Sequence, residues 1–150
     1  MLCSLTEPPE GKVMKKIPVV SNIFVEAPEG PRLVGSRCAS CKTPYFPRTA
    51  VCHNPDCTES KIEDALFGPK GTVWSVAVQD YPPPSPARFD KPYQPYAMGV
   101  VDLDDGLRVL GRMTSSDPRS VEVGTRVELV IDALCHDDEG NEITTWKFKS

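Results

Sequence analysis

The sequence predicts a mainly β protein in which a small metal-binding module precedes a closed barrel of short strands. Four of the six cysteines lie between positions 38 and 57, in a paired spacing typical of a metal site. From residue 72 onward, apolar and polar residues alternate in five short segments, the pattern of half-buried strands. These features predict a rubredoxin-like zinc ribbon followed by a five-stranded OB-fold barrel, with one short N-terminal helix.

The composition narrows the class of protein. The 150 residues carry a net charge of −4, with 39% hydrophobic and 25% charged residues, which suits one or two small soluble domains. No nucleic-acid partner is expected, because nucleic-acid binders usually carry a basic face. No apolar run approaches the ~20 residues of a membrane span, and the first residues lack the pattern of a signal peptide. We therefore expect a cytoplasmic protein without a membrane partner, whose clustered cysteines bind metal rather than form disulfides.

Residues 1–30 are expected to form an N-terminal tail and a short helix. The segment 7–12 is rich in proline and glycine and is unsuited to a compact element. Ser21 or Asn22 can cap a helix over residues 23–25, which Pro28 then limits.

The cysteine cluster falls in residues 31–62, the predicted zinc ribbon. The spacing is C-x2-C, ten residues, then C-x4-C, so that each pair can turn both sulfurs toward one point. All-sulfur tetrahedral coordination selects zinc, or iron of the rubredoxin type. Four protein ligands leave no open position, which predicts one structural Zn²⁺ rather than a Lewis acid. His53 is an alternative fourth ligand, and the predicted set is Cys38, Cys41, Cys52 and Cys57.

Residues 63–150 are predicted to form the barrel, after a connector over residues 61–70. Trp74, Val76 and Val78 are expected on one face of the first strand. Tight turns are expected at Asp104-Asp105-Gly106 and at residues 138–141. The five predicted strands cover residues 72–79, 96–103, 107–113, 127–131 and 144–148.

One connection is long. Residues 80–95 contain six prolines and three aromatic residues, and structureless loops of this length are usually functional or disordered. Residues 83–88 also fit a P-x-x-P-x-R ligand of proline-binding modules. An ordered surface loop is the simpler interpretation.

No catalytic residue is predicted. Cys135 and His136 are neighbours on a strand, so their side chains point to opposite faces and cannot easily form a nucleophile and base. Asp102, Asp104 and Asp105 are interpreted as turn residues rather than as a site for acid–base chemistry.

Together, the motifs resemble the acyl-CoA-associated zinc-ribbon plus OB-fold family, also called domain of unknown function thirty-five. The resemblance covers roughly residues 20–149. The second cysteine pair departs from it, because many members have C-x2-C where this chain has C-x4-C. The matching segments are residues 33–41, 45–48, 71–75, 95–101 and 146–148, with Cys52 and Cys57.

The resemblance implies a non-catalytic subunit of an acyl-CoA-processing hetero-oligomer. The implied partner is a thiolase-fold catalytic subunit that cleaves a 3-oxoacyl-CoA, such as the benzoylsuccinyl-CoA of aromatic degradation, with free CoA. This chain would stabilise the partner and shape its acyl-CoA site. An enoyl-CoA hydratase or an aldolase is an alternative partner, and a zinc-ribbon/OB nucleic-acid-binding protein is the alternative from another class.

The long loop supplies the implied contacts with a partner or with acyl-CoA. Aromatic side chains are common anchors of protein interfaces, and Arg88, Lys91 or Arg112 are candidates for contact with CoA phosphates. The candidate contact residues are Tyr81, Arg88, Phe89, Lys91, Tyr93 and Tyr96.

Overall fold

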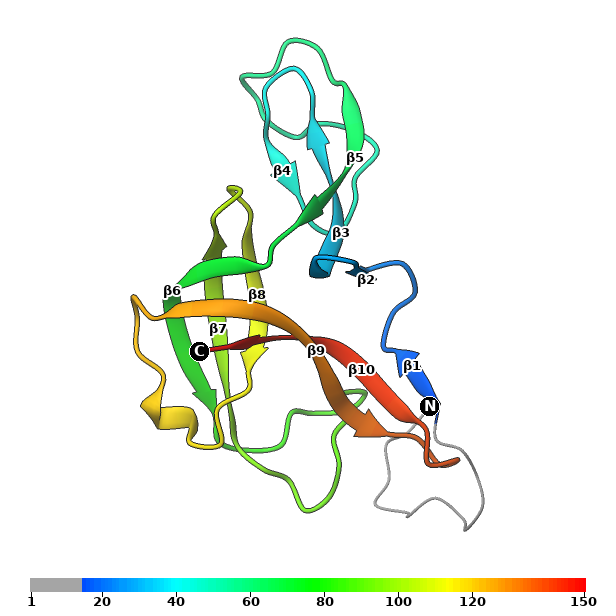
Figure 1. Ribbon diagram of the computed structural model, residues 1–150, viewed down its shortest axis with the longest axis vertical. Coiled ribbons are helices and arrows are strands. Elements are labelled where there is room, and N and C mark those ends of the chain that lie inside the picture. Colours follow the sequence, from blue (N-terminus) through cyan, green and yellow to red (C-terminus); the bar gives the residue numbers. More distant parts are fainter. Residues whose placement is uncertain (1–14) are drawn as a thin grey trace.

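The computed structural model describes residues 15–150, which form two β-sheets (Figure 1). A four-stranded sheet contains the cysteine-rich segment, and a six-stranded sheet contains the barrel. The predicted tail lies mostly outside the described residues. Within them, the one helical element is the 3-10 turn η1 (Pro118–Ser120), and no helix is long and apolar enough to cross a membrane.

The smaller sheet is built around β3 (Gly30–Cys38). The strands β2 (Phe24–Ala27), β4 (Pro44–Tyr45) and β5 (Ile62–Phe67) all pair antiparallel with it. The predicted N-terminal helix is therefore wrong, because its apolar residues lie in and next to β2. Asn22 has a φ of 61° and forms a turn instead of a helix cap. The run Phe24-Val25 favours a strand, and β3 supplies the partner.

The predicted connector over residues 61–70 is also wrong, because most of it is β5. Only Phe67 of this strand is fully buried, and Glu63 and Asp64 are exposed. The strand forms through its backbone pairing with β3, from Leu33↔Phe67 to Cys38↔Ile62. A strand that buries so little apolar surface has no clear alternation in sequence.

The larger sheet closes into the predicted barrel. Its strand order is β1-β10-β8-β7-β6-β9, and the additional pairing of β10 with β9 closes the ring. β8 and β10 pair in parallel while the other pairs within the ring are antiparallel. β1 (Lys16–Pro18) adds in parallel to the outer edge of β10. The barrel strands are β6 (Lys70–Gln79), β7 (Tyr96–Leu103), β8 (Arg108–Met113), β9 (Arg126–His136) and β10 (Glu142–Lys149).

A bulge changes the predicted face of the first barrel strand. Val73 pairs with Val101 and Ser75 pairs with Val100, which leaves Trp74 as the extra residue. Val73 is buried, whereas the Trp74 side chain is 53% exposed and carries the Arg108 guanidinium 3.9 Å from its ring centroid. Trp74 therefore does not line the core.

The two predicted turns are present. Gly106 and Gly140 have φ values of 99° and 81°, a region that glycine adopts without strain. The amide of Gly106 donates to Leu103 O, and that of Gly140 donates to Asp137 O, both at 3.0 Å.

One hydrophobic core connects the two sheets. Leu33 of β3 and Phe67 of β5 are fully buried against barrel residues that include Leu129 and Phe148. A Cβ on Gly35 would collide with the Tyr45 carbonyl and the Phe67 ring, so glycine is required where these pack. The turn after β7 adds polar contacts, because Asp105 O accepts from Arg37 at 2.7 Å and the Asp105 carboxylate accepts from Gly68 N at 2.9 Å.

Candidate metal centre and the cleft beside it

The four cysteines meet at the tip of the smaller sheet. Cys38 ends β3, Cys41 follows in the next turn, and Cys52 and Cys57 come from the loop between β4 and β5. The four sulfurs lie within 4.8 Å of one another. Two of the sulfur pairs are 3.8 Å and 3.5 Å apart. A tetrahedron with Zn–S bonds of about 2.3 Å requires sulfurs about 3.8 Å apart, so the residues fit a tetrahedral zinc ion.

The turn after β3 places the first two sulfurs. Lys42 N donates to Cys38 O at 2.8 Å, and Cys38 N donates to Thr43 O at 3.0 Å. Lys42 has a φ of 67°, which reverses the chain immediately after Cys41. The turn is thus closed by backbone hydrogen bonds and directs both side chains inward.

A second turn accommodates the longer spacing between Cys52 and Cys57. The Asn54 carboxamide oxygen accepts from Asp56 N, and Asn54 O accepts from Cys57 N, both at 3.0 Å. This arrangement is an Asx turn. The Asn54 amide also donates to Thr43 Oγ1 at 3.1 Å, which joins the two turns. The C-x4-C spacing therefore still delivers both sulfurs to the cluster.

Tyr45 forms a hydrogen bond with one of the four cysteines. Its hydroxyl accepts from His53 N at 2.7 Å, so its own hydrogen is free for Cys52 Sγ at 3.2 Å. The His53 ring instead faces Thr49 Oγ1 at 3.0 Å and packs edge-on against Tyr45. The structure thus does not bring His53 into the cluster.

The thiols influence one another strongly. Backbone hydrogen bonds from Cys41 and Lys61 lower the pKa of Cys38 to about 6. The Glu59 backbone lowers the pKa of Cys57, but burial and the three neighbouring thiols together raise it to about 12. Negative charge accumulates as the cluster ionises, so four thiolates require a cation among them.

We predict that Tyr45→Phe weakens zinc binding about tenfold to a hundredfold, since outer hydrogen bonds to ligands are worth this much. The variant removes the hydroxyl between His53 N and Cys52 Sγ while keeping the ring. Competition with a chromogenic chelator measures the affinity. Tyr81→Phe is the matched control, because Tyr81 is 72% exposed. Equal zinc affinities for the two variants would contradict the role of Tyr45.

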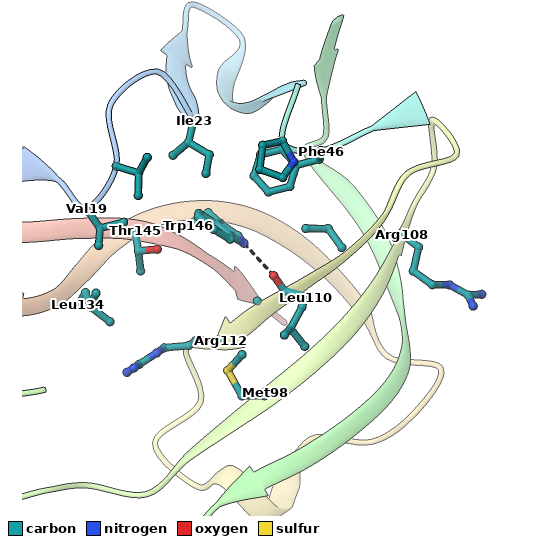
Figure 2. Close-up of a pocket in the computed structure, with 14 residues that line it drawn as sticks. Val19, Ile23, Phe46, Met98, Arg108, Leu110, Arg112, Leu134, Thr145 and Trp146 are labelled. Carbon is teal, nitrogen blue, oxygen red and sulfur yellow. Dashed lines mark hydrogen bonds between the residues drawn. The ribbon is translucent and has the colours of Figure 1, made fainter. Parts of the chain in front are cut away.

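An apolar cleft of about 580 Å³ lies between the smaller sheet and the barrel (Figure 2). Ile23 and Phe46 stand on one side of it, and Met98, Leu110 and Arg112 stand on the other. The Trp146 ring lies between them, held by a 3.0 Å hydrogen bond from its Nε1 to Leu110 O. Phe46 packs edge-on against this ring with centroids 5.3 Å apart. Sequence reasoning missed this cleft, because its walls come from segments far apart in the chain.

Arg112 of β8 lines the cleft beside the long loop. Its guanidinium lies 3.8 Å from the Tyr96 ring centroid, and burial lowers its pKa. Other barrel arginines are paired with carboxylates: Arg108 with Asp102 at 2.6 Å and Arg126 with Asp104 at 2.7 Å. Those arginines hold the pKa values of Asp102 and Asp104 below their ordinary range.

The long loop folds back onto the barrel. The Tyr93 hydroxyl donates to Gln79 O at 2.6 Å, and the Asp90 carboxylate faces the amide and ring of His136 at 2.9 Å and 2.8 Å. Phe89 packs edge-on against Tyr93, which packs against Tyr96. Three of the candidate contact residues, Phe89, Tyr93 and Tyr96, thus form one aromatic cluster. Arg88 precedes Phe89 and is half-buried, whereas Tyr81 and Lys91 are exposed.

Comparison with known proteins identifies the family of this chain. A family model described as "ChsH2, rubredoxin-like zinc ribbon domain" matches residues 25–63, and "ChsH2, C-terminal OB-fold domain" matches residues 65–132. A "DUF35 domain-containing scaffold protein" of Methanothermobacter thermautotrophicus is 32% identical over 124 residues, 81% of this chain and 89% of that protein. The chain belongs to the DUF35 family. The predicted zinc ribbon and OB-fold are both confirmed.

Two further proteins that are similar to this chain have the names of enzymes or enzyme subunits. A "probable enoyl-CoA hydratase alpha subunit" of Thermomonospora curvata is 31% identical over 131 residues, which are 85% of this chain but 38% of that protein. The solved structure "Ltp2-ChsH2(DUF35) aldolase" matches with a TM-score of 0.56 and 30% identity, covering 79% of this chain and 84% of that one.

Proposed function

We propose that this DUF35 chain is a non-catalytic scaffold subunit of an acyl-CoA-processing enzyme, with a thiolase-fold catalytic partner. The observation that carries the proposal is a metal site that four cysteines close, which leaves no position on the metal for a substrate, in a chain similar to proteins named scaffold proteins. Cys135 is buried while the ring of His136 faces Asp90, and the aspartates near the β7–β8 turn are bound to arginines or to a backbone amide.

The relatives support this class of function. Archaeal members are named scaffold proteins and have nearly the length of this chain. In thiolysis, a thiolate attacks the 3-oxo carbon, the bond between C2 and C3 breaks, and the C2 carbanion takes a proton. The nucleophile and the proton carriers for these steps would belong to the partner. This chain would order the partner and help to exclude water from the CoA thioester.

An aldolase partner is the second candidate, favoured by the solved aldolase complex to which this chain is similar. A hydratase partner is favoured by the hydratase subunit with a DUF35-like segment. The scaffold would be the same in each case, and the reaction would differ with the partner's active site.

Affinity purification of the tagged chain from its native cell tests the proposal. We expect a stoichiometric thiolase-fold partner, one zinc per small chain, and no turnover by the small chain alone. Recovery of an aldolase or a hydratase instead would replace the thiolase assignment. Turnover by the isolated chain, or its recovery with nucleic acid, would overturn the scaffold function.

A further inference from the structure

We propose that Cys41 and Cys52 are an oxidation site, at which a peroxide joins the two sulfurs in a disulfide and loosens the contact between the ribbon and the barrel at Phe46 and Trp146. The zinc that these sulfurs would hold is then released. Such a reaction needs only residues of this chain, so it would occur whichever enzyme is the partner and does not rest on the proposed scaffold function.

The four sulfurs differ in their access to solvent. Cys38 is fully buried, whereas Cys41, Cys52 and Cys57 are partly exposed. Cysteine oxidation depends on exposure and on thiolate character, and metal binding requires all four sulfurs to be deprotonated. A small oxidant therefore reaches the cluster at the three partly exposed sulfurs first.

Distance selects one pair of sulfurs. Cys41 Sγ and Cys52 Sγ lie 3.5 Å apart and both are partly exposed. The pair formed by Cys38 and Cys57 is wider, at 3.8 Å, and includes the buried sulfur. A disulfide bond of about 2.0 Å requires a movement of about 1.5 Å between Cys41 and Cys52. Both lie in turns of a tip without a fully buried side chain, so this movement disturbs no core.

The hydroxyl groups beside this pair favour the same reaction. Thr43 Oγ1 lies 3.1 Å from Cys41 Sγ, and the Tyr45 hydroxyl lies 3.2 Å from Cys52 Sγ. Both oxygens already accept a hydrogen bond from another group, so each has its own hydrogen free. Cys57 Sγ instead faces the carbonyl oxygen of Glu59 at 3.3 Å, which can only accept.

The reaction proceeds in two displacements. One sulfur attacks an oxygen of hydrogen peroxide, the O–O bond breaks, and a sulfenic acid and a hydroxide form. The second sulfur then attacks the first, the S–S bond forms, and the S–O bond breaks to release a second hydroxide. Two electrons pass from the two sulfurs to the peroxide, and the hydroxides take two protons from solvent. The hydroxyls of Thr43 and Tyr45 are placed to donate hydrogen bonds to the departing hydroxide.

Tyr45 and Phe46 connect this pair to the barrel. The Tyr45 hydroxyl contacts Cys52 Sγ, and the next residue, Phe46, packs edge-on against Trp146 with ring centroids 5.3 Å apart. A disulfide sulfur is a weaker acceptor than a thiolate, and the two remaining cysteines cannot enclose a zinc ion. The end of β4 then loses its attachment, and Phe46 is expected to move off the Trp146 ring.

Peroxide titration of the zinc-loaded full chain tests the oxidation site. In a Trp74→Phe background, Trp146 is the one remaining tryptophan. We expect hydrogen peroxide to release the zinc, to join Cys41 to Cys52 as shown by peptide mapping, and to shift Trp146 emission to longer wavelength. A thiol reductant with added zinc should restore the starting state. A first disulfide between any other two cysteines, or oxidation to sulfinic acid without a disulfide, would overturn the assignment.

Thr43→Val tests the role of the neighbouring hydroxyl. It should slow disulfide formation roughly threefold to tenfold, the usual worth of one hydrogen bond, while Thr43→Ser should keep the parent rate. A variant that merely bound zinc more weakly would be oxidised faster, so the direction of the change separates the two effects. Equal rates for Thr43→Val and Thr43→Ser would contradict the assisted reaction.

Phe46→Leu tests the connection to the barrel. It should release zinc as the parent does but lose at least about half of the shift in Trp146 emission. Phe89→Leu is the matched control and should keep the full shift, since Phe89 packs on Tyr93 in the long loop. Equal shifts in the two variants, or zinc release from the parent without a shift, would overturn the connection. The titration uses no partner, so a chain that resists peroxide would leave the scaffold function, tested by purification, standing.

Discussion

Loss of zinc is expected to unfold the tip of the ribbon while the barrel stays folded. Among residues 39–61 no side chain is fully buried, so the tip has no hydrophobic core. Its strand β4 spans only Pro44–Tyr45. The cysteine cluster is therefore the main source of its stability, and structural zinc contributes about 10–16 kcal/mol in small zinc domains. The base of the ribbon differs, because Leu33 and Phe67 pack into the barrel core.

Cys41→Ser tests this expectation, with the exposed neighbour Ser40→Ala as its matched control. We expect Cys41→Ser to lose most of its zinc, measured per chain by elemental analysis. Hydrogen exchange should then become fast over residues 38–60 and stay slow in the barrel strands β7 and β9. The zinc-dependent account of the tip is wrong if residues 38–60 remain protected in a metal-free chain.

The features that sequence could predict are those with a local signal. The paired spacing of the four cysteines predicted the metal cluster, because sulfurs so close in sequence have few other arrangements. Alternating residues such as Val127, Leu129 and Ile131 predicted their strand, since one face of β9 is buried. The turn at Asp104-Asp105-Gly106 also had a local signal, because its residue types favour a tight turn and Gly106 adopts a positive φ.

The features that sequence missed depend on contacts between distant segments. Phe24 and Val25 form a strand because β3 lies beside them, and tertiary pairing overrides a weak helix-cap signal. The bulge at Trp74 moves that side chain out of the core, which strict alternation cannot foresee. The cleft needs Ile23, Phe46 and Trp146 to converge from three separate segments. Arg112 was suspected only as a cation, because the fold is needed to show that no carboxylate within residues 15–150 pairs with it.

Phe67→Ala is expected to destabilise the whole chain by about 3–5 kcal/mol, the usual cost of truncating a buried phenylalanine. The Phe67 ring is fully buried, and it joins the core of the smaller sheet to that of the barrel. It packs closely over Gly35, and the Arg37 guanidinium lies 5.3 Å from its centroid. Removing the ring leaves a cavity at the point where both halves share one core.

Leu66→Ala is the matched control, since Leu66 is the preceding residue of β5 and is 54% exposed. Urea unfolding should be followed by Trp146 fluorescence in the Trp74→Phe background and, in parallel, by zinc release. We expect unfolding of the barrel to release the zinc as well, because the base of the ribbon shares its core with the barrel. In Phe67→Ala both midpoints should fall, whereas Leu66→Ala should change stability by less than about 1 kcal/mol. Equal effects of the two substitutions would contradict the role of Phe67 in a core shared by the ribbon and the barrel.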